Sequence, residues 1–208
     1  MPTLYYVGDP MCSWCWGFSR VLDDVLGMLP SGVNLHYVMG GLAPDSDELM
    51  PTAVRKYVQD NWREVAKITN AKFNWDFWQK CHPRRSTYPA CRAAIAGGRQ
   101  GALPQMFQAL QRAYYLEARN PSDTETHFEL ASEIGLDMGR FAKDLGSEYV
   151  ERLLQSDFTK KIHMGVNEFP TMVLGNGNNY TLIMRGWASS NEILNCLREQ
   201  LRCQQPLL

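Results

Sequence analysis

Two cysteines lie close together near the start of the chain, in the sequence Cys12-Ser13-Trp14-Cys15. Cysteine exchanges disulfides as a thiolate, and the reaction needs a second thiol near enough to resolve the mixed disulfide. A spacing of two residues places the second thiol close to the first. If the motif also begins a helix, the free N–H groups of the first turn favour the thiolate. The pattern indicates thiol–disulfide exchange, with Cys12 as the attacking sulfur and Cys15 as the resolving one.

The two residues between the sulfurs need not react themselves. We expect Ser13 to tune the reduction potential through a hydroxyl hydrogen bond, and Trp14 to tune it through local packing. Half of a zinc site is the structural alternative for the cysteines, but no second C-x-x-C or histidine pair lies at ligand spacing elsewhere. We therefore predict no metal site, and no cofactor apart from the redox-active disulfide of Cys12 and Cys15.

Four further cysteines have no motif around them. Cys81 and Cys91 are ten residues apart across two prolines, so a second redox pair is conceivable, but two unrelated thiols fit better. Cys196 and Cys203 share a face of the predicted last helix at about 10 Å separation, too far for a bond. We expect them to be spare thiols.

The elements that position Cys12 follow from the hydrophobic pattern. Residues 3–7 form an expected strand that ends in a Gly-Asp-Pro turn. Apolar residues at helical spacing then run from the cysteines to Leu29, which predicts one helix that the motif begins. Alternation over residues 33–39 predicts a second strand, parallel to the first through a right-handed crossover. The motif thus lies at the junction of a strand and a helix.

The rest of the chain divides into a long helical stretch and a closing unit. Residues 42–146 predict several helices and no convincing strand. A helix over 147–163 follows, then a hairpin of strands at 171–174 and 180–184 with a turn at 175–179. Ser189 and Glu192 form an expected capping box for the last helix. We predict a discontinuous thioredoxin-like domain of residues 1–41 and 147–208, with an inserted helical domain of residues 42–146.

Composition restricts the function classes. The chain has 208 residues, a formal net charge of −1 and 21% charged residues, which argues against a nucleic-acid or acidic-membrane surface. No apolar run approaches the ~18 residues of a membrane span. The first nine residues carry no Lys or Arg and too short an apolar run for an export signal. We expect a cytoplasmic protein with no nucleic-acid or membrane partner.

The motif, the strand before it, the helical insertion and the segment Gly165-Val166-Asn167-Glu168-Phe169-Pro170-Thr171 resemble the DsbA-type thiol oxidoreductases. The FrnE-like cytoplasmic branch, with its predicted disulfide isomerases, is the nearest part of that family. The resemblance covers nearly the whole chain. It implies an α/β, thioredoxin-like fold with a large helical insertion, and a thiol–disulfide oxidoreductase of the protein disulfide isomerase type.

In that family the proline before the third strand is cis and faces the cysteine pair. By this resemblance Pro170 is cis, and Phe169 and Thr171 flank a groove where an extended client pairs beside the active sulfur. Taken alone, Pro170 is an ordinary strand boundary, because proline has no N–H for a sheet. Ser13-Trp14 replaces the Pro-His of periplasmic relatives and Phe169 replaces a small residue; neither change supports strong oxidising power.

Two other functions fit the sequence. A glutathione-dependent transferase or isomerase of the same fold would use a serine near the position of Cys12, and two intact cysteines argue against it. A non-enzymatic peptide-binding or holdase module would use Trp14, Trp16 and Phe169 as an apolar surface. The leading hypothesis is an enzyme whose partners are protein or small-molecule thiols and disulfides, glutathione included. The sequence makes no prediction of oligomeric state.

Overall fold

A four-stranded mixed sheet forms the centre of the fold. The computed structural model describes residues 2–177 and 179–203. The strand order is β2-β1-β3-β4. Strand β1 pairs in parallel with β2 and antiparallel with β3, and β3 pairs antiparallel with β4. The strands are β1 (Thr3–Gly8), β2 (Asn34–Met39), β3 (Thr171–Asn176) and β4 (Asn179–Arg185). The predicted α/β class, the parallel pair and the hairpin are confirmed.

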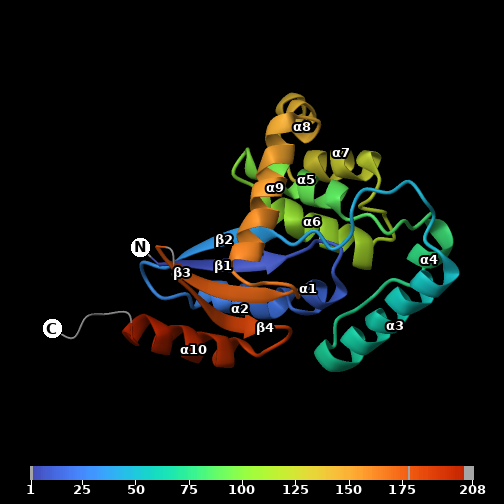
Figure 1. The fold of residues 1–208 in the computed structure, drawn as a ribbon. Helices are drawn as coiled ribbons and strands as arrows, with labels where there is room; N and C mark the ends of the chain where they lie inside the picture. The colour runs from blue at the N-terminus through green and yellow to red at the C-terminus, as the bar shows by residue number, and fades with distance from the viewer. Residues whose placement is uncertain (1, 178, 204–208) are drawn as a thin grey trace.

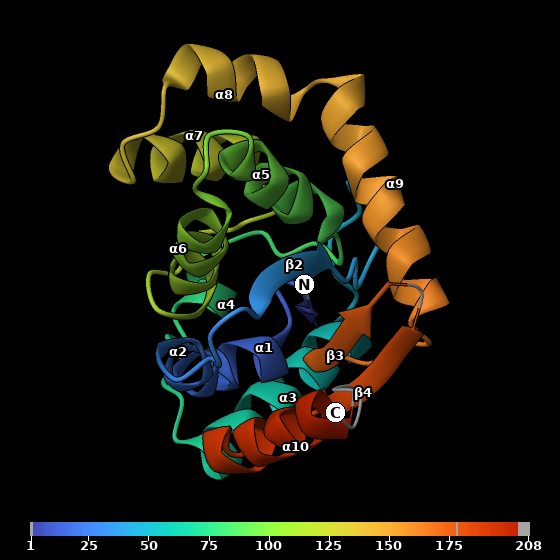
Figure 2. The same cartoon turned by 90° about the vertical axis from the view of Figure 1, so that its left-hand side faces the viewer.

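The alternation of β1 gives the sheet two apolar faces. Leu4 and Tyr6 are fully buried in the large core, whereas Val7 belongs to a smaller cluster with Val38 and Val173 on the other face. Successive side chains of a strand point to opposite faces. Helix α9 lies on one side of the sheet and α1 and α2 on the other (Figure 2). Both faces are therefore covered.

The helices fall into two groups along the chain. Helices α1 (Ser13–Gly17) and α2 (Ser19–Gly27) follow β1, and α10 (Ser190–Cys203) ends the described chain beside α2 and β4. The other helices lie between β2 and β3 in sequence. Of these, α5 to α8 lie together on the β2 side of the sheet (Figure 1). They are α3 (Thr52–Thr69), α4 (Phe77–Lys80), α5 (Tyr88–Gly98), α6 (Leu103–Tyr115), α7 (Thr124–Glu133), α8 (Met138–Leu145) and α9 (Glu148–His163).

One core joins the sheet to the inserted helices. Tyr6 of β1 stacks on Phe18 at 6.1 Å between ring centroids and meets Phe107 of α6 edge-on at 6.0 Å. Aromatic pairs in these arrangements stabilise a core beyond their buried area. The division into residues 1–41 with 147–208 and residues 42–146 stays a prediction, and residues 204–208 lie outside the described part.

Two local expectations were wrong, and one short helix in the predicted helical stretch was not foreseen. The single helix from the cysteines to Leu29 is two helices that meet at Phe18, because Gly17 lets α1 approach α3 closely and Phe18 turns into the core. A Cβ at Gly17 would lie 2.6 Å from Val65. The short helix α4 was not predicted. The turn at 175–179 is shorter, because β3 continues to Asn176 and β4 begins at Asn179; residue 178 lies outside the described residues.

Local capping signals were accurate. Ser189 Oγ accepts from the Glu192 N–H at 3.4 Å, and the Ser189 N–H donates to Glu192 Oε2 at 2.8 Å, as a capping box requires. Ser147 begins α9, and its Oγ accepts from the Val150 N–H at 3.2 Å. Across residues 2–177 and 179–203, no helix has the length and apolar character of a membrane span.

Replacing Ser147 with alanine removes the side-chain cap of α9, the helix that covers one face of the sheet. We expect a loss of about 1 kcal/mol in the free energy of unfolding, the usual cost of a lost N-cap. Ser156→Ala in the exposed interior of the same helix is the matched control, and alanine's helix propensity predicts no loss there. Urea unfolding of the two variants measures the difference, and equal midpoints would contradict the capping role.

Candidate active site

Cys12 lies at the junction of β1 and α1. It is the N-cap residue of α1, with extended backbone angles, and its carbonyl accepts from the Trp16 N–H at 3.0 Å. Its own N–H donates to the Asp9 carbonyl at 3.1 Å. Its side chain is only 6% exposed, and its Sγ donates to the Phe169 carbonyl oxygen at 3.7 Å. The sulfur therefore lies between the start of the helix and the loop before β3.

Cys15 lies one turn further into α1 and is fully buried. Burial raises the pKa of the Cys15 thiol well above its usual value, and the neighbouring Cys12 raises it further. Both cysteines are free thiols in the structure. A buried thiol with a raised pKa stays protonated, so Cys15 can donate a hydrogen bond to Cys12.

The pKa of Cys12 is shifted in the opposite direction. The hydrogen bond from the Cys15 thiol is the largest effect and lowers the pKa of Cys12, against the opposing effect of burial. The backbone N–H of Cys15 lowers the pKa further, the charge of Asp9 raises it, and the backbone N–H of Trp14 has the smallest lowering effect of these. Since the thiolate is the nucleophile, Cys12 is the sulfur of the pair that ionises first.

The loop before β3 lies against Cys12. The peptide bond between Phe169 and Pro170 is cis. The Gly186 N–H donates to the Pro170 carbonyl at 2.9 Å, and Thr171 Oγ1 donates to the Glu168 carbonyl at 2.8 Å. Thr171 is buried, so its side chain supports the loop from within. These bonds fix the Phe169 carbonyl beside the sulfur.

The Phe169 ring is fixed from its other side. A Cβ at Gly40 would lie 2.7 Å from the ring, so only glycine allows this approach. Lys161 of α9 lies over the ring at 5.3 Å and its ammonium donates to the Gly40 carbonyl. A cation over an aromatic face is attracted by the ring electrons. Helix α9 therefore helps to place Phe169.

A cavity of about 390 Å³ opens beside Cys12. Phe169, expected at a substrate groove, lines it, and so do Ser13 and Trp14, whereas Pro170 and Thr171 are not among its lining residues. Further walls, which no sequence pattern indicated, come from the helical stretch and from the loop after β4. They include Tyr57, Asn61, Trp62, Arg85 and Trp187.

Little in the sequence marked those residues. Tyr57 and Asn61 are four apart and share a face of α3. Tyr57 is 62% exposed and Trp187 is 41% exposed, and both rings line the cavity. Asn61 and Arg85 have ordinary surface residue types, so only their approach to Cys12 reveals them.

Asp9 anchors the loop that precedes Cys12. Its carboxylate is fully buried, and burial raises its pKa. Oδ1 accepts from the Met11 N–H at 2.8 Å, and Oδ2 accepts from the Leu42 N–H at 2.7 Å and from Thr87 Oγ1 at 2.7 Å. Cys91 Sγ also donates to Oδ2, at 3.6 Å. One side chain thus ties three segments together.

The other four cysteines form no hydrogen bond with Cys12 or Cys15 in the described part of the chain. Cys81 Sγ donates to the Ala118 carbonyl at 3.0 Å, while Cys91 donates to Asp9, so these two have different partners. Cys196 is half-buried and Cys203 is exposed on α10, and all are free thiols. Among residues 2–177 and 179–203, no group of three or more His, Cys, Asp or Glu side chains could hold a metal ion.

The sheet order, the cysteine pair at the start of α1 and the inserted helices are those of a thioredoxin-like fold with a helical insertion. A family model described as "Thioredoxin" matches residues 5–195, and the chain belongs to that family. The predicted fold class and the DsbA-type resemblance are both confirmed.

A search of curated proteins found a similar bacterial protein. The ClpXP adapter protein SpxH of Bacillus subtilis is 25% identical over 177 residues, which are 83% of this chain and 58% of that protein. The chain therefore spans less than two thirds of the length of this relative.

Solved structures share the fold at low identity. A candidate protein disulfide isomerase from Nitrosomonas europaea has a TM-score of 0.87 at 24% identity, covering 98% of this chain and 99% of that chain. The cytosolic disulfide reductase DsbM from Pseudomonas aeruginosa has a TM-score of 0.78 at 24% identity, covering 97% and 99%. DsbM has also been solved with GSH, with a TM-score of 0.76 at 23% identity, covering 96% and 99%.

The pH dependence of Cys12 alkylation tests the hydrogen bond from Cys15. Because that bond is the largest effect lowering the pKa of Cys12, Cys15→Ala should shift the midpoint of iodoacetamide alkylation to higher pH. Cys15→Ser keeps a donor and should shift it less. Mass mapping follows Cys12 alone, and Cys196→Ala should leave the midpoint unchanged. An unmoved midpoint in Cys15→Ala would contradict the role of the bond.

Proposed function

We propose that this protein exchanges dithiols and disulfides through Cys12 and Cys15. The observation that carries the proposal is the pairing of a cavity-lining thiol of lowered pKa with a fully buried thiol of raised pKa, one turn apart. Such a pair separates the roles of nucleophile and resolving thiol. The disulfide between Cys12 and Cys15 is then the only redox group that the proposed reaction uses.

The reaction proceeds in two exchanges. The Cys12 thiolate attacks one sulfur of a substrate disulfide, forms a mixed disulfide and releases the other sulfur as a thiolate, which takes up a proton. Cys15 then loses its proton and attacks Cys12 Sγ, which releases the second substrate thiol. The substrate disulfide gains two electrons and the pair becomes a disulfide. The reverse sequence oxidises a substrate dithiol.

The other predicted residues act around this step. Ser13 and Trp14 line the cavity beside the sulfur, where we propose that they tune the reduction potential. The Phe169 ring forms part of the wall that a substrate touches, and its carbonyl lies at Cys12. Pro170 and Thr171 fix that carbonyl through the bonds of Pro170 to Gly186 and of Thr171 to Glu168.

We propose protein disulfides and small thiols, glutathione included, as the partners, with disulfide isomerisation as one outcome of the exchange. A volume of about 390 Å³ suits a small ligand. The DsbM structure with GSH and the candidate disulfide isomerase support these partners by analogy. A cytoplasmic setting belongs to the same proposal, supported by the cytosolic DsbM neighbour.

Protein binding without redox chemistry is the second candidate function. The relative SpxH is an adapter protein, and exposed Tyr57 and Trp187 beside the cavity offer an apolar contact surface. A variant with both Cys12 and Cys15 changed to serine separates the two functions. If the double variant still binds unfolded clients, the adapter or holdase role is favoured. If the single variant Cys12→Ser still transfers glutathione, a glutathione transferase is favoured instead.

Insulin reduction with dithiothreitol as the reductant tests the leading proposal. Cys12→Ala should reduce catalysed turnover to the uncatalysed rate, because the nucleophile is lost. Incubated with insulin in the absence of dithiothreitol, which would itself resolve the intermediate, Cys15→Ala should accumulate a mixed disulfide at Cys12, visible by mass spectrometry, because the resolving thiol is lost. Cys196→Ala on α10 is the matched control and should match the unmodified protein. Undiminished turnover in Cys12→Ala would overturn the proposal.

A further inference from the structure

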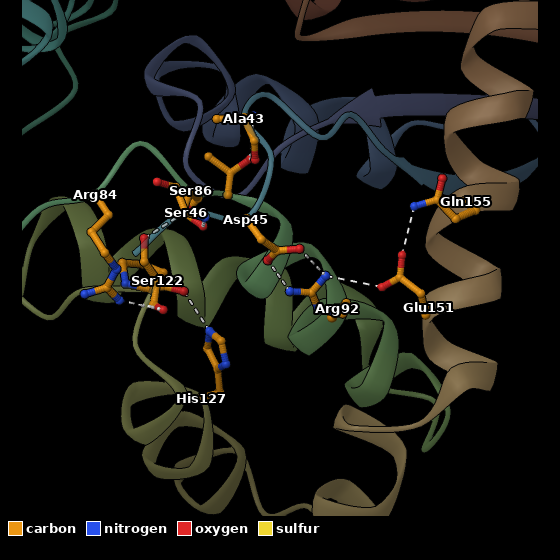
Figure 3. A network of polar contacts seen from close by, with 12 residues as sticks. Ala43, Asp45, Ser46, Arg84, Ser86, Arg92, Ser122, His127, Glu151 and Gln155 are labelled. Carbon is orange, nitrogen blue, oxygen red and sulfur yellow. Dashed lines mark hydrogen bonds and ion pairs between the residues drawn. The ribbon is translucent and has the colours of Figure 1, made fainter. Parts of the chain in front are cut away.

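The segment between α4 and α5 is held on both sides of Arg85. Arg84 donates to the Ser122 carbonyl at 2.9 Å and pairs with Asp123. Ser122 Oγ donates to the Ser86 carbonyl at 2.7 Å, and the Ser86 hydroxyl accepts from the Ser46 N–H at 3.2 Å (Figure 3). These bonds fix the backbone on which Arg85 lies.

Arg85 itself has no hydrogen-bond or ion-pair partner in the described part of the chain, although its charge acts on nearby Tyr114. It is half-buried, yet it forms no hydrogen bond or ion pair with any other described residue. The other half-buried arginines of residues 2–177 and 179–203 each have a partner, and they are Arg55, Arg84, Arg92 and Arg119. A guanidinium carries five donors and remains charged at all physiological pH values. Arg85 therefore holds unused donors in a partly desolvated position.

Arg85 is one of the residues that line the cavity containing Cys12. Arg85 lines this cavity together with Cys12, Trp14 and Phe169. Glu168 lines it too, but no ion pair joins Glu168 to Arg85. A carboxylate is the planar anion that a guanidinium binds with two parallel hydrogen bonds. A substrate carboxylate in this cavity would satisfy Arg85 while its disulfide lies beside Cys12.

We propose that Arg85 determines specificity by binding a carboxylate of the substrate, so that the cavity selects small disulfides that carry a carboxylate near the sulfur. This inference rests on the proposed exchange at Cys12. The redox step is unchanged: Cys12 and Cys15 give two electrons to the disulfide, and two thiols leave. Arg85 adds the attraction that offsets the repulsion between a substrate carboxylate and the Cys12 thiolate.

Three disulfides of similar size and different charge test the proposal. They are 3,3′-dithiodipropionate with two carboxylates, bis(2-hydroxyethyl) disulfide with no charge, and cystamine with two ammonium groups. Pre-reduced protein is mixed with an excess of each, and loss of free thiols at Cys12 and Cys15 gives a rate constant. The readout is the ratio of the dithiodipropionate rate to the hydroxyethyl rate, which cancels general damage to the thiols.

Arg85→Gln should lower this ratio by roughly 10- to 100-fold, the usual effect of a lost hydrogen bond to a charged group. Arg85→Lys keeps the charge but not the two parallel bonds and should retain part of the preference. Arg85→Glu should lower the ratio further and raise the relative rate with cystamine. Arg198→Gln removes an exposed, unpaired arginine of α10 outside the cavity lining and should keep the wild-type ratio.

An equal ratio in the wild-type protein and Arg85→Gln would overturn the role of Arg85. Wild-type protein that no disulfide oxidises would instead contradict the exchange at Cys12. Calorimetry of dithiodipropionate binding to the Cys12→Ser protein distinguishes a failure of the Arg85 site from a failure of the exchange at Cys12. Affinity that falls at least tenfold on adding Arg85→Gln supports the carboxylate site without any redox step, and unchanged affinity overturns it.

Discussion

The buried Asp9 carboxylate is the interaction on which the position of Cys12 depends. It joins the loop before Cys12 through Met11, the segment after β2 through Leu42, and the N-terminal end of α5 through Thr87. A fully buried carboxylate is costly unless donors surround it, and removing it would leave these donors without a partner. The sheet and the inserted helices are thus fastened together next to the reactive sulfur.

This arrangement gives the two parts of the chain different tasks at one cavity. The strand, the short helix and the loop at Phe169 supply the sulfurs and the carbonyl beside them. The helical stretch supplies Tyr57 and Arg85, and Thr87 is the residue through which Asp9 fixes the segment of Arg85. Exchange chemistry and substrate choice can therefore be altered separately, because different segments carry them.

The sequence predicted what depends on local pattern. The strands on either side of the motif, the closing hairpin, the placement of Cys12 at a helix start and the caps at Ser147 and Ser189 all follow from neighbouring residues. The break at Phe18 depends instead on contact between Gly17 and α3, about fifty residues away.

The contacts of Asp9 and the position of Arg85 at the cavity also depend on distant segments. Thr87 and Cys91 look like ordinary helix-start residues, and only tertiary packing brings them to Asp9. Arg85 is of an ordinary surface residue type, and only its place at the cavity, without a hydrogen-bond or ion-pair partner among residues 2–177 and 179–203, distinguishes it. Single-sequence patterns describe periodicity and caps, whereas such contacts depend on how distant segments meet.

The structure also changes the account of how Cys12 is activated. Helix α1 has only five residues, and the largest effect on the pKa of Cys12 is the Cys15 thiol, with backbone N–H groups adding less. The same contact raises the pKa of Cys15, through its bond to Cys12 and through the charge on Cys12. Once Cys12 is part of a mixed disulfide its charge is gone, so both of those effects end and only burial still opposes ionisation. Cys15 therefore becomes easier to deprotonate at the step where it must attack.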